Sequence, residues 1–158
     1  MKKIIALILA CVCMLSLCAC GGEKQDENTQ VELDLAALST SMQEKIGVTM
    51  PELNQNMALN LYGLTTEDCA EMVILSDYDA TKCNEVWLIK ASGEEALGTV
   101  KELAQNRVDA LIAQSNNYNA DVYAASNDAR IETRGLYLLL VVTTAGDSGE
   151  VAQLFLNA

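Results

Sequence analysis

The segment that most restricts the fold of this chain is Leu136–Thr144, whose sequence LYLLLVVTT is apolar on both faces of the strand that it predicts. A strand of this kind has to be covered on both sides, so we expect it in the middle of a sheet. In the preceding residues, 129–134, Ala, Ile and Thr alternate with Arg, Glu and Arg, a pattern typical of a half-buried strand. Gly135 lies between the two segments, which together predict a hairpin.

A second hairpin is predicted at Glu71–Ser76 and Glu85–Ala91, which read EMVILS and EVWLIKA. Both are rich in β-branched and aromatic residues, and the polar sequence DYDATKCN joins them. A turn near Ala80 places Cys83 opposite Tyr78 and leaves Cys69 about 30 Å away along the ribbon. Because bridged cysteines need Cα atoms within roughly 7 Å, we expect two buried free thiols and no disulfide.

Apolar residues recur at helical spacing in the rest of the chain. Pro51 is expected as the first residue of a helix. Ser92 and Asp147 are expected as N-caps, because Glu95 and Glu150 follow three residues later and complete capping boxes. The predicted helices run from Asp34 to Gly47, from Pro51 to Gly63, from Ser92 to about Asn116 and from Asp147 to Phe155, with a short helical turn at 121–126.

These elements follow one another in the order α-α-β-β-α-β-β-α. The two hairpins make an antiparallel sheet of about four strands, and amphipathic helices cover at least one of its faces. The sequence therefore predicts an α+β fold, with residues 34–158 forming a single domain. Trp87 and Tyr137 are expected in its core.

The N-terminus has the features of a bacterial export signal. Lys2 and Lys3 precede an apolar stretch that continues to Ala19. The sequence Leu-Cys-Ala-Cys at 17–20 resembles the lipobox of bacterial lipoproteins. This resemblance implies that residues 1–19 are removed and that Cys20 carries a diacylglycerol, whose two acyl chains make a stable membrane anchor.

Residues 20–33 continue the lipidated cysteine as a flexible acidic tether, because the segment 21–32 is almost entirely polar. The folded part is then held outside the cytoplasmic membrane. The net charge of −12 becomes −14 when Lys2 and Lys3 leave with the signal. Nucleic acid and anionic lipid headgroups repel such a chain, so we expect no nucleic-acid binding and attachment to the membrane through the lipid alone.

Several short motifs resemble one known family. They are Leu61-Tyr62-Gly63-Leu64, Asn84-Glu85-Val86, the capped helix that follows, and the sequence from Arg134 to Val142. In this order the chain resembles the bacterial lipoprotein family catalogued as domain of unknown function 4358, over roughly Leu35 to Ala158. The chain has Leu136 where the hairpin turn of this family is expected to have a small polar residue such as Asn. The resemblance brings no catalytic residues to this sequence.

The sequence contains no histidine, the side chain best suited to proton transfer near neutral pH and the commonest metal ligand. The string Gly146-Asp147-Ser148-Gly149 looks like the nucleophile loop of a trypsin-like protease, but that chemistry needs an imidazole base. The same residues are explained by Asp147 as an N-cap. We therefore expect no nucleophilic catalysis by Ser148.

Three acidic residues, Asp77, Asp79 and Glu85, gather around the first hairpin turn. Asp77 and Asp79 are two residues apart and would share one face of a strand. Such carboxylates could bind calcium or act in glycoside hydrolysis, but Thr81 and Lys82 depart from the EF-hand pattern. A solvated acidic turn is favoured, with Glu85 paired to Lys82, making a capping hydrogen bond, or acting as a ligand.

The sequence thus predicts a non-catalytic binding or interaction domain at the cell envelope, with an envelope protein or wall component as partner and no cofactor. The alternative is a histidine-independent enzyme that uses Asp77, Asp79 or Glu85 on a cell-wall or glycan substrate. Paired carboxylates that line one concave pocket would favour the enzyme. A scattered acidic surface would favour binding.

Overall fold

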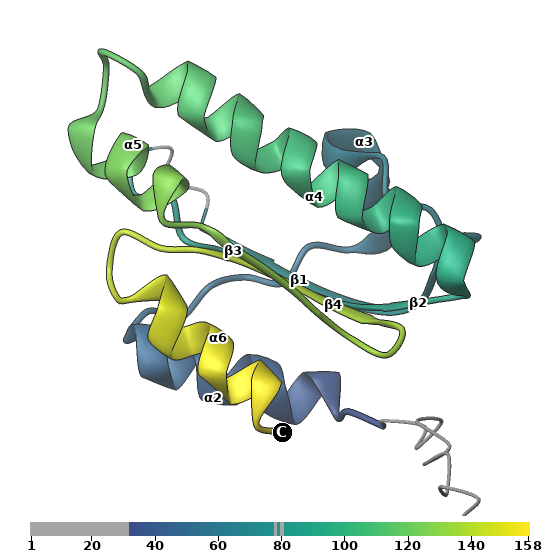
Figure 1. Ribbon diagram of the computed structural model, residues 1–158. Helices are drawn as coiled ribbons and strands as arrows, with labels where there is room; N and C mark the ends of the chain where they lie inside the picture. The colour runs from purple at the N-terminus through teal and green to yellow at the C-terminus, as the bar shows by residue number, and fades with distance from the viewer. Residues whose placement is uncertain (1–31, 78, 80) are drawn as a thin grey trace, which may run out of the picture. The chain divides into compact units, whose positions relative to one another are not determined.

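The computed structural model describes residues 32–158 except Tyr78 and Ala80. The predicted signal peptide, Cys20 and most of the predicted tether lie outside the described residues. In this described part, five helices and four strands follow one another in the predicted order, and the short helical turn predicted at 121–126 is a helix of its own (Figure 1). They are α2 (Leu35–Ile46), α3 (Gln55–Tyr62), β1 (Cys69–Ser76), β2 (Glu85–Ala91), α4 (Glu94–Ser115), α5 (Ala120–Asn127), β3 (Arg130–Arg134), β4 (Tyr137–Val142) and α6 (Ser148–Leu156).

The four strands form one antiparallel sheet in the order β1-β2-β4-β3. The two predicted hairpins are therefore adjacent, joined where β2 pairs with β4. Every residue of β4 is buried, which confirms its predicted central position. The α+β fold class predicted from the sequence is confirmed.

Helices cover both faces of the sheet (Figure 1). Helices α2 and α6 lie on one face, and α3 and α4 lie on the other. Side chains along β4 alternate between the two layers. Leu139 packs in the α2/α6 layer, whereas Leu138 and Leu140 pack in the layer of α4.

Local signals set several helix ends as predicted. The Asp34 carboxylate accepts a hydrogen bond from the Ala37 amide at the start of α2, and Gly47 ends that helix with φ 77°. Asp147 accepts from the Glu150 amide and caps α6. Ser148 is consequently the buried first residue of α6.

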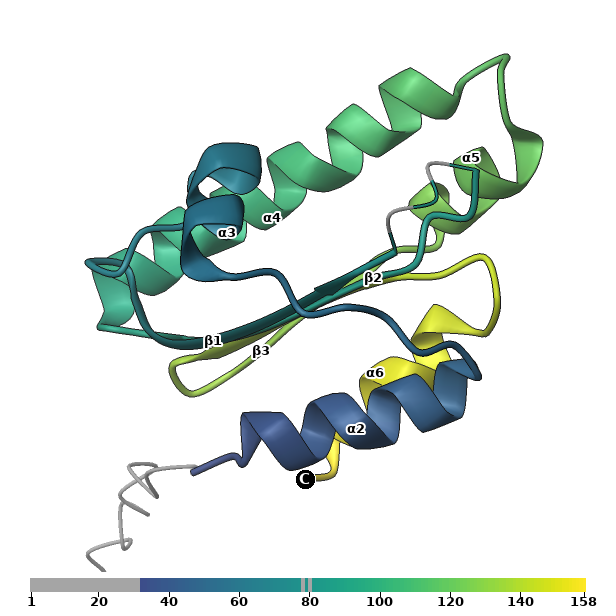
Figure 2. The same cartoon turned by 180° about the vertical axis from the view of Figure 1, so that it is seen from behind.

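The prediction that a helix begins at Pro51 is wrong. Asn54 caps a helix that begins at Gln55, and the preceding residues run along the edge of β1 (Figure 2). The Leu53 amide donates to the Ile74 carbonyl at 2.8 Å, and the Ser76 amide donates to the Pro51 carbonyl at 3.1 Å. Covering a strand edge satisfies backbone groups that a helical turn at Pro51 would leave open.

The predicted capping box at Ser92 is also wrong. Gly93 occupies the N-cap position of α4 and supplies no side-chain hydrogen bond. The Ser92 hydroxyl instead donates to the Glu67 carbonyl at 2.6 Å, tying the start of α4 to the segment before β1. The Ser92 side chain, which the local pattern assigned to the helix cap, is thus used in a tertiary hydrogen bond.

The β3–β4 turn explains why Leu136 is tolerated. Arg134 pairs with Tyr137, so Gly135 and Leu136 form a two-residue connection. Gly135 has φ 58°, and Leu136 is not among the residues with positive φ. A two-residue hairpin turn with positive φ only at its first position places no such demand on the second, where a branched side chain fits.

Cys69 and Cys83 are free cysteines, as predicted. Cys69 is buried and Cys83 is half-buried. The predicted position of Cys83 opposite Tyr78 lies outside the described residues. Among the helices that the structure describes, none has the length and apolar character needed to cross a bilayer.

Candidate functional site

The centre of the candidate site is the buried carboxylate of Glu85, the first residue of β2, whose side chain is 2% exposed. Arg107 of α4 donates to it through Nε, 3.1 Å from each oxygen, and through Nη2, 2.8 Å from Oε2. Trp87 donates from Nε1 to Oε1 at 2.8 Å. Tyr62 donates from its hydroxyl to Oε2 at 3.2 Å.

Three elements bring these side chains together. Glu85 and Trp87 are two residues apart on β2 and so share one face of the sheet. Tyr62 is the last residue of α3, and the centre of its ring lies 4.7 Å from the centre of the Trp87 ring. The Arg107 guanidinium lies 5.2 Å from the centre of the Tyr62 ring, within range of a cation–π interaction.

The network leaves the Glu85 carboxylate with no free acceptor role. An ionised carboxylate has about four lone-pair sites, and five donor contacts already point at this one. Burial alone would lower the pKa of Arg107, but the hydrogen bonds and charge of Glu85 outweigh it and raise that pKa above its usual value. The Glu85 carboxylate is therefore held in one place by its neighbours.

Of the three alternatives that the sequence left open for Glu85, pairing with Lys82 is wrong. Lys82 lies 3.5 Å from the Asp79 carboxylate instead, and Arg107 takes the place beside Glu85. The sequence contains a signal for this partner, because Arg107 comes seven residues after Val100 and four before Leu111, both buried. Helical spacing places it on the same side of α4 as those residues.

A pocket of about 240 Å³ opens beside Glu85. The β1–β2 connection and the adjoining strand ends contribute one wall, and α4, the α4–α5 loop and α5 contribute the other. The lining residues are Ser76, Asp77, Asp79, Cys83, Asn84 and Glu85 on the first wall, and Arg107, Leu111, Gln114, Ser115, Tyr118, Asn119 and Val122 on the second.

The structure brings all three predicted acidic residues, Asp77, Asp79 and Glu85, into the lining of this pocket. Asp77 and Asp79 do not share the face of a strand, because β1 ends at Ser76 and both lie in the connection that follows. Asp77 accepts a hydrogen bond from the Asp79 amide at 3.0 Å. The hydroxyl and amide of Thr81 hydrogen-bond to Asp79 and hold the pKa of that carboxyl below its usual value.

Two asparagines fix the walls of the pocket. The Asn119 side chain caps α5 and donates to the Thr81 carbonyl at 3.1 Å, which links the α4–α5 loop to the β1–β2 connection. Asn84, 2% exposed, accepts from the Thr143 hydroxyl at 2.7 Å and from the Thr144 amide at 3.1 Å. The pocket is thus pre-formed by the fold.

Other groups near the pocket stay protonated at neutral pH. Burial, followed by the charge of Glu85, raises the pKa of Tyr62 to about 12 and that of Cys83 to about 11. A thiol with such a pKa is a poor nucleophile. The described part of the chain contains no cluster of three or more cysteine, aspartate or glutamate side chains placed to hold a metal ion.

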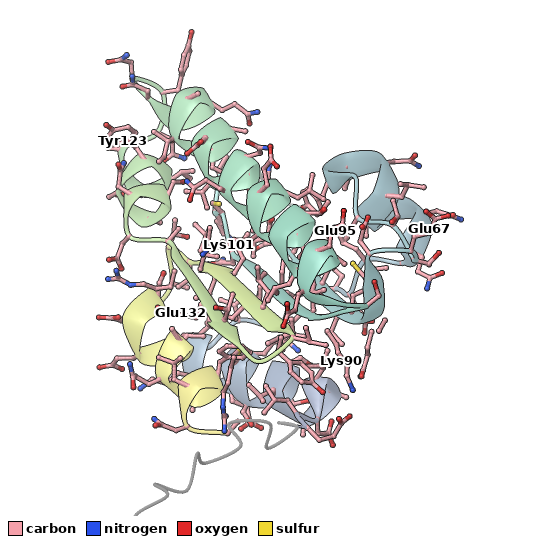
Figure 3. The ribbon with its side chains drawn as sticks, turned by 45° about the vertical axis from the view of Figure 1, so that its right-hand side comes forward. Glu67, Lys90, Glu95, Lys101, Tyr123 and Glu132 are labelled. Carbon is pink, nitrogen blue, oxygen red and sulfur yellow. The ribbon has the colours of Figure 1, made fainter. Side chains whose placement is uncertain are left out.

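The pocket and Glu32, the first described residue, lie at opposite ends of β2. Glu32 binds the Lys90 amine at 2.9 and 3.0 Å, near the last residue of β2, whereas Glu85 begins that strand. Figure 3 shows the same separation, with Lys90 at one end of the folded part and Tyr123 of α5 at the other.

Comparison with known proteins decides the family. A family model described as "Domain of unknown function (DUF4358)" matches residues 43–143. The chain belongs to this family. No curated protein and no solved structure matches the chain.

The resemblance found in the sequence motifs is therefore confirmed for the DUF4358 family. The match includes all four strands, α3, α4 and α5, so every residue that lines the pocket falls within the family domain. Most of α2 and all of α6 lie at or beyond the edges of the matched range.

Proposed function

We propose that this chain is a membrane-anchored extracytoplasmic lipoprotein whose folded part is a non-catalytic binding domain at the cell envelope. One observation carries the binding role. The pocket has walls fixed by Asn84 and Asn119, and at its base a carboxylate, Glu85, that is saturated by its own neighbours. Such a site is rigid and offers recognition without a reactive group.

The absence of histidine and the chemistry of the pocket support a non-catalytic role. A general acid or base needs a titratable group with a pKa near the working pH. Asp79 has a lowered pKa, and the Cys83 thiol has a raised one. The pKa values of Asp79 and Cys83 are therefore displaced away from neutral pH, and the Glu85 carboxylate is already bound by Arg107, Trp87 and Tyr62.

The anchor rests on the sequence of residues 1–20. With the lipid on Cys20, the tether would enter the folded part near Glu32, and the pocket would open at the far end of β2. Residues 32–158 carry 19 acidic and 7 basic side chains, so anionic lipid headgroups repel the folded part.

Replacing the lipidated residue tests the anchor. In Cys20→Ala, we expect the mature chain to leave the membrane fraction and appear in soluble extracytoplasmic fractions, because no other group attaches it. Fractionation followed by immunoblotting measures this, with Cys18→Ala as the matched control that keeps the anchor. Retention of Cys20→Ala in the membrane would overturn the proposed localisation.

Crosslinking on intact cells tests the binding role. We expect the tethered chain to capture a reproducible envelope component. The released Cys20→Ala chain, which is no longer held beside that component, should capture less. If neither form captures anything reproducible, the proposed binding role fails.

A histidine-independent carboxylate enzyme is the second candidate, because Asp77, Asp79 and Glu85 line one pocket, the arrangement that, from the sequence, is expected to favour an enzyme. Incubation with cell-wall fragments and mass spectrometry of the products would test it. An activity that disappears in Asp77→Asn, with the fold intact by circular dichroism, would support the enzyme. No product from any wall fragment would eliminate this candidate.

A further inference from the structure

A second hollow adjoins the first pocket. It has a volume of about 360 Å³ and is lined by residues 115–120 and Tyr123. Ser115, Tyr118 and Asn119 line both hollows, so the two meet around the α4–α5 loop. Tyr118 is 91% exposed between them. We call this combined surface the Tyr118 groove.

Apart from Arg107, which is bound to Glu85, the α4–α5 side of the Tyr118 groove is uncharged and rich in amides. The eleven residues 110–120 contain no charged side chain, although the folded part as a whole is strongly acidic. Gln114, Asn116 and Asn117 are exposed. A side-chain amide both donates and accepts hydrogen bonds, so it matches a ligand that carries hydroxyl or amide groups.

Tyr118 adds an apolar platform to these polar groups. Its ring is rigid, exposed and close to hydrogen-bonding side chains, a combination that supplies contact area at low cost in conformational entropy. The faces of sugar rings carry C–H groups that pack on an aromatic ring, while their edges carry hydroxyls. On the opposite wall, Asp77 and Asp79 offer oxygens that accept from hydroxyl groups.

The basic residues argue against an anionic ligand. Five of the seven in residues 32–158 form salt bridges with acids of the same chain: Lys45, Lys82, Lys90, Arg107 and Arg130. Among the lining residues, Arg107 is the only basic one, and it is bound to Glu85. A phosphate or carboxylate would therefore meet no uncommitted cation in the groove and would face Asp77 and Asp79.

From these observations we infer that the Tyr118 groove binds a neutral oligosaccharide. One sugar ring packs on Tyr118, and neighbouring hydroxyl or acetamido groups bind the amides and the two aspartates. This inference rests on the proposed binding role and specifies its ligand class. The same chemistry occurs in an acetamido-bearing wall glycan and in a plain glucan, which the experiment separates.

Titration of the ¹⁵N-labelled mature chain, residues 20–158 with Cys20→Ala to keep it soluble, tests the inference by nuclear magnetic resonance. The probes are triacetylchitotriose, with acetamido groups, and cellotriose, without them. We expect saturable shifts of amides at 114–119 and 77–85. Stronger binding of triacetylchitotriose indicates a wall-type glycan, and equal or stronger binding of cellotriose indicates recognition through hydroxyls alone.

Two exposed positions provide matched variants. Tyr118→Ala removes the platform from a side chain that makes no core contact, and we expect about a tenfold rise in Kd. Leu61→Ala removes another exposed apolar side chain, 61% exposed on α3 and outside both hollows, and should leave Kd unchanged.

The inference is overturned if neither sugar shifts these amides. It is also overturned if the Tyr118→Ala variant binds the sugar as tightly as the protein that keeps Tyr118. A third probe, 1,5-diaminopentane, tests the acidic wall alone. Shifts with this diamine and with neither sugar would overturn the inference and mark a cation site. These failures leave the crosslinking result untouched, so loss of the ligand class and loss of the proposed binding role are distinguishable.

Discussion

The two faces of the sheet are built differently. On the α2/α6 face, the packed side chains are almost entirely apolar, with Leu139 and Phe155 among those fully buried. On the α4 face, the apolar core surrounds a buried ion pair, Glu85 with Arg107, and the pocket opens at its edge. The first face is stabilised mainly by apolar burial, whereas the second combines burial with a fixed polar network.

The difference shows where recognition can be placed in a small domain. An apolar face tolerates changes in sequence provided that the side-chain volume is kept, so it offers few specific polar contacts for a ligand. The polar network on the other face joins residues 22 and 23 positions apart in sequence and holds α3, β2 and α4 in one arrangement. The pocket walls contributed by β2 and α4 are therefore also held in one arrangement.

The largest expected effect is the loss of the cation on the α4 face. Arg107→Met leaves the buried Glu85 carboxylate without its charged partner, and breaking such a pair costs about 3–5 kcal/mol of unfolding free energy. Urea unfolding measures this. Lys101→Met, on the exposed side of the same helix (Figure 3), is the control and should change stability by less than about 0.5 kcal/mol. Equal effects of the two variants would contradict a buried, paired role for Arg107.

On the α2/α6 face, Leu139→Ala should lower the unfolding free energy by about 3 kcal/mol, because it leaves a cavity in a fully buried layer. The same variant should leave the amide chemical shifts of Asp77 and Asn119 unchanged, since both lie at the pocket on the α4 side of the sheet. Shifts of those amides as large as the ones in α6 would show that the two faces are not independent.

A smaller effect is expected from the cap of α6. Asp147→Ala removes the hydrogen bond to the Glu150 amide and should cost about 1 kcal/mol. Thermal unfolding measures the loss, and Asp147→Ser, which retains a capping oxygen, should recover most of it. No difference between the alanine and serine variants would rule out a capping role.

A pH-dependent effect is expected at alkaline pH. The folded state raises the pKa of Cys83 from 9.0 to about 11, so the unfolded chain loses the thiol proton first. This contribution to stability is complete below pH 9 and is lost as the pH rises to about 11. Unfolding free energy measured across that range should fall, and the fall should be shallower in Cys83→Ala. A slope that is identical in the two proteins would place the thiol in a solvated environment.

Much of the fold was predictable because it follows from local apolar spacing. The apolar segment at 136–144 predicted the central β4, and Asp34 and Asp147 predicted the helix starts that they cap. The starts predicted at Pro51 and Ser92 were wrong, because contacts with β1 and with Glu67 took over those backbone and side-chain groups. Such contacts join segments far apart in sequence and leave no local pattern.

The candidate site was predicted only in part. The gathering of Asp77, Asp79 and Glu85 followed from their positions around one hairpin turn. The partner of Glu85 did not, because Arg107 lies on a different element and its selection over Lys82 depends on how α4 crosses the sheet. The contribution of Tyr118 was missed as well, since only the fold places the α4–α5 loop opposite the hairpin.

Site-specific photocrosslinking on intact cells tests most directly whether the α4 side of the sheet carries the binding site. A photoreactive residue is placed at Tyr118, in the groove, or at Glu44, exposed on α2 of the opposite face. We predict a reproducible adduct with an envelope component from position 118 and none from position 44. An adduct from position 44 alone, or from neither position, would contradict the account.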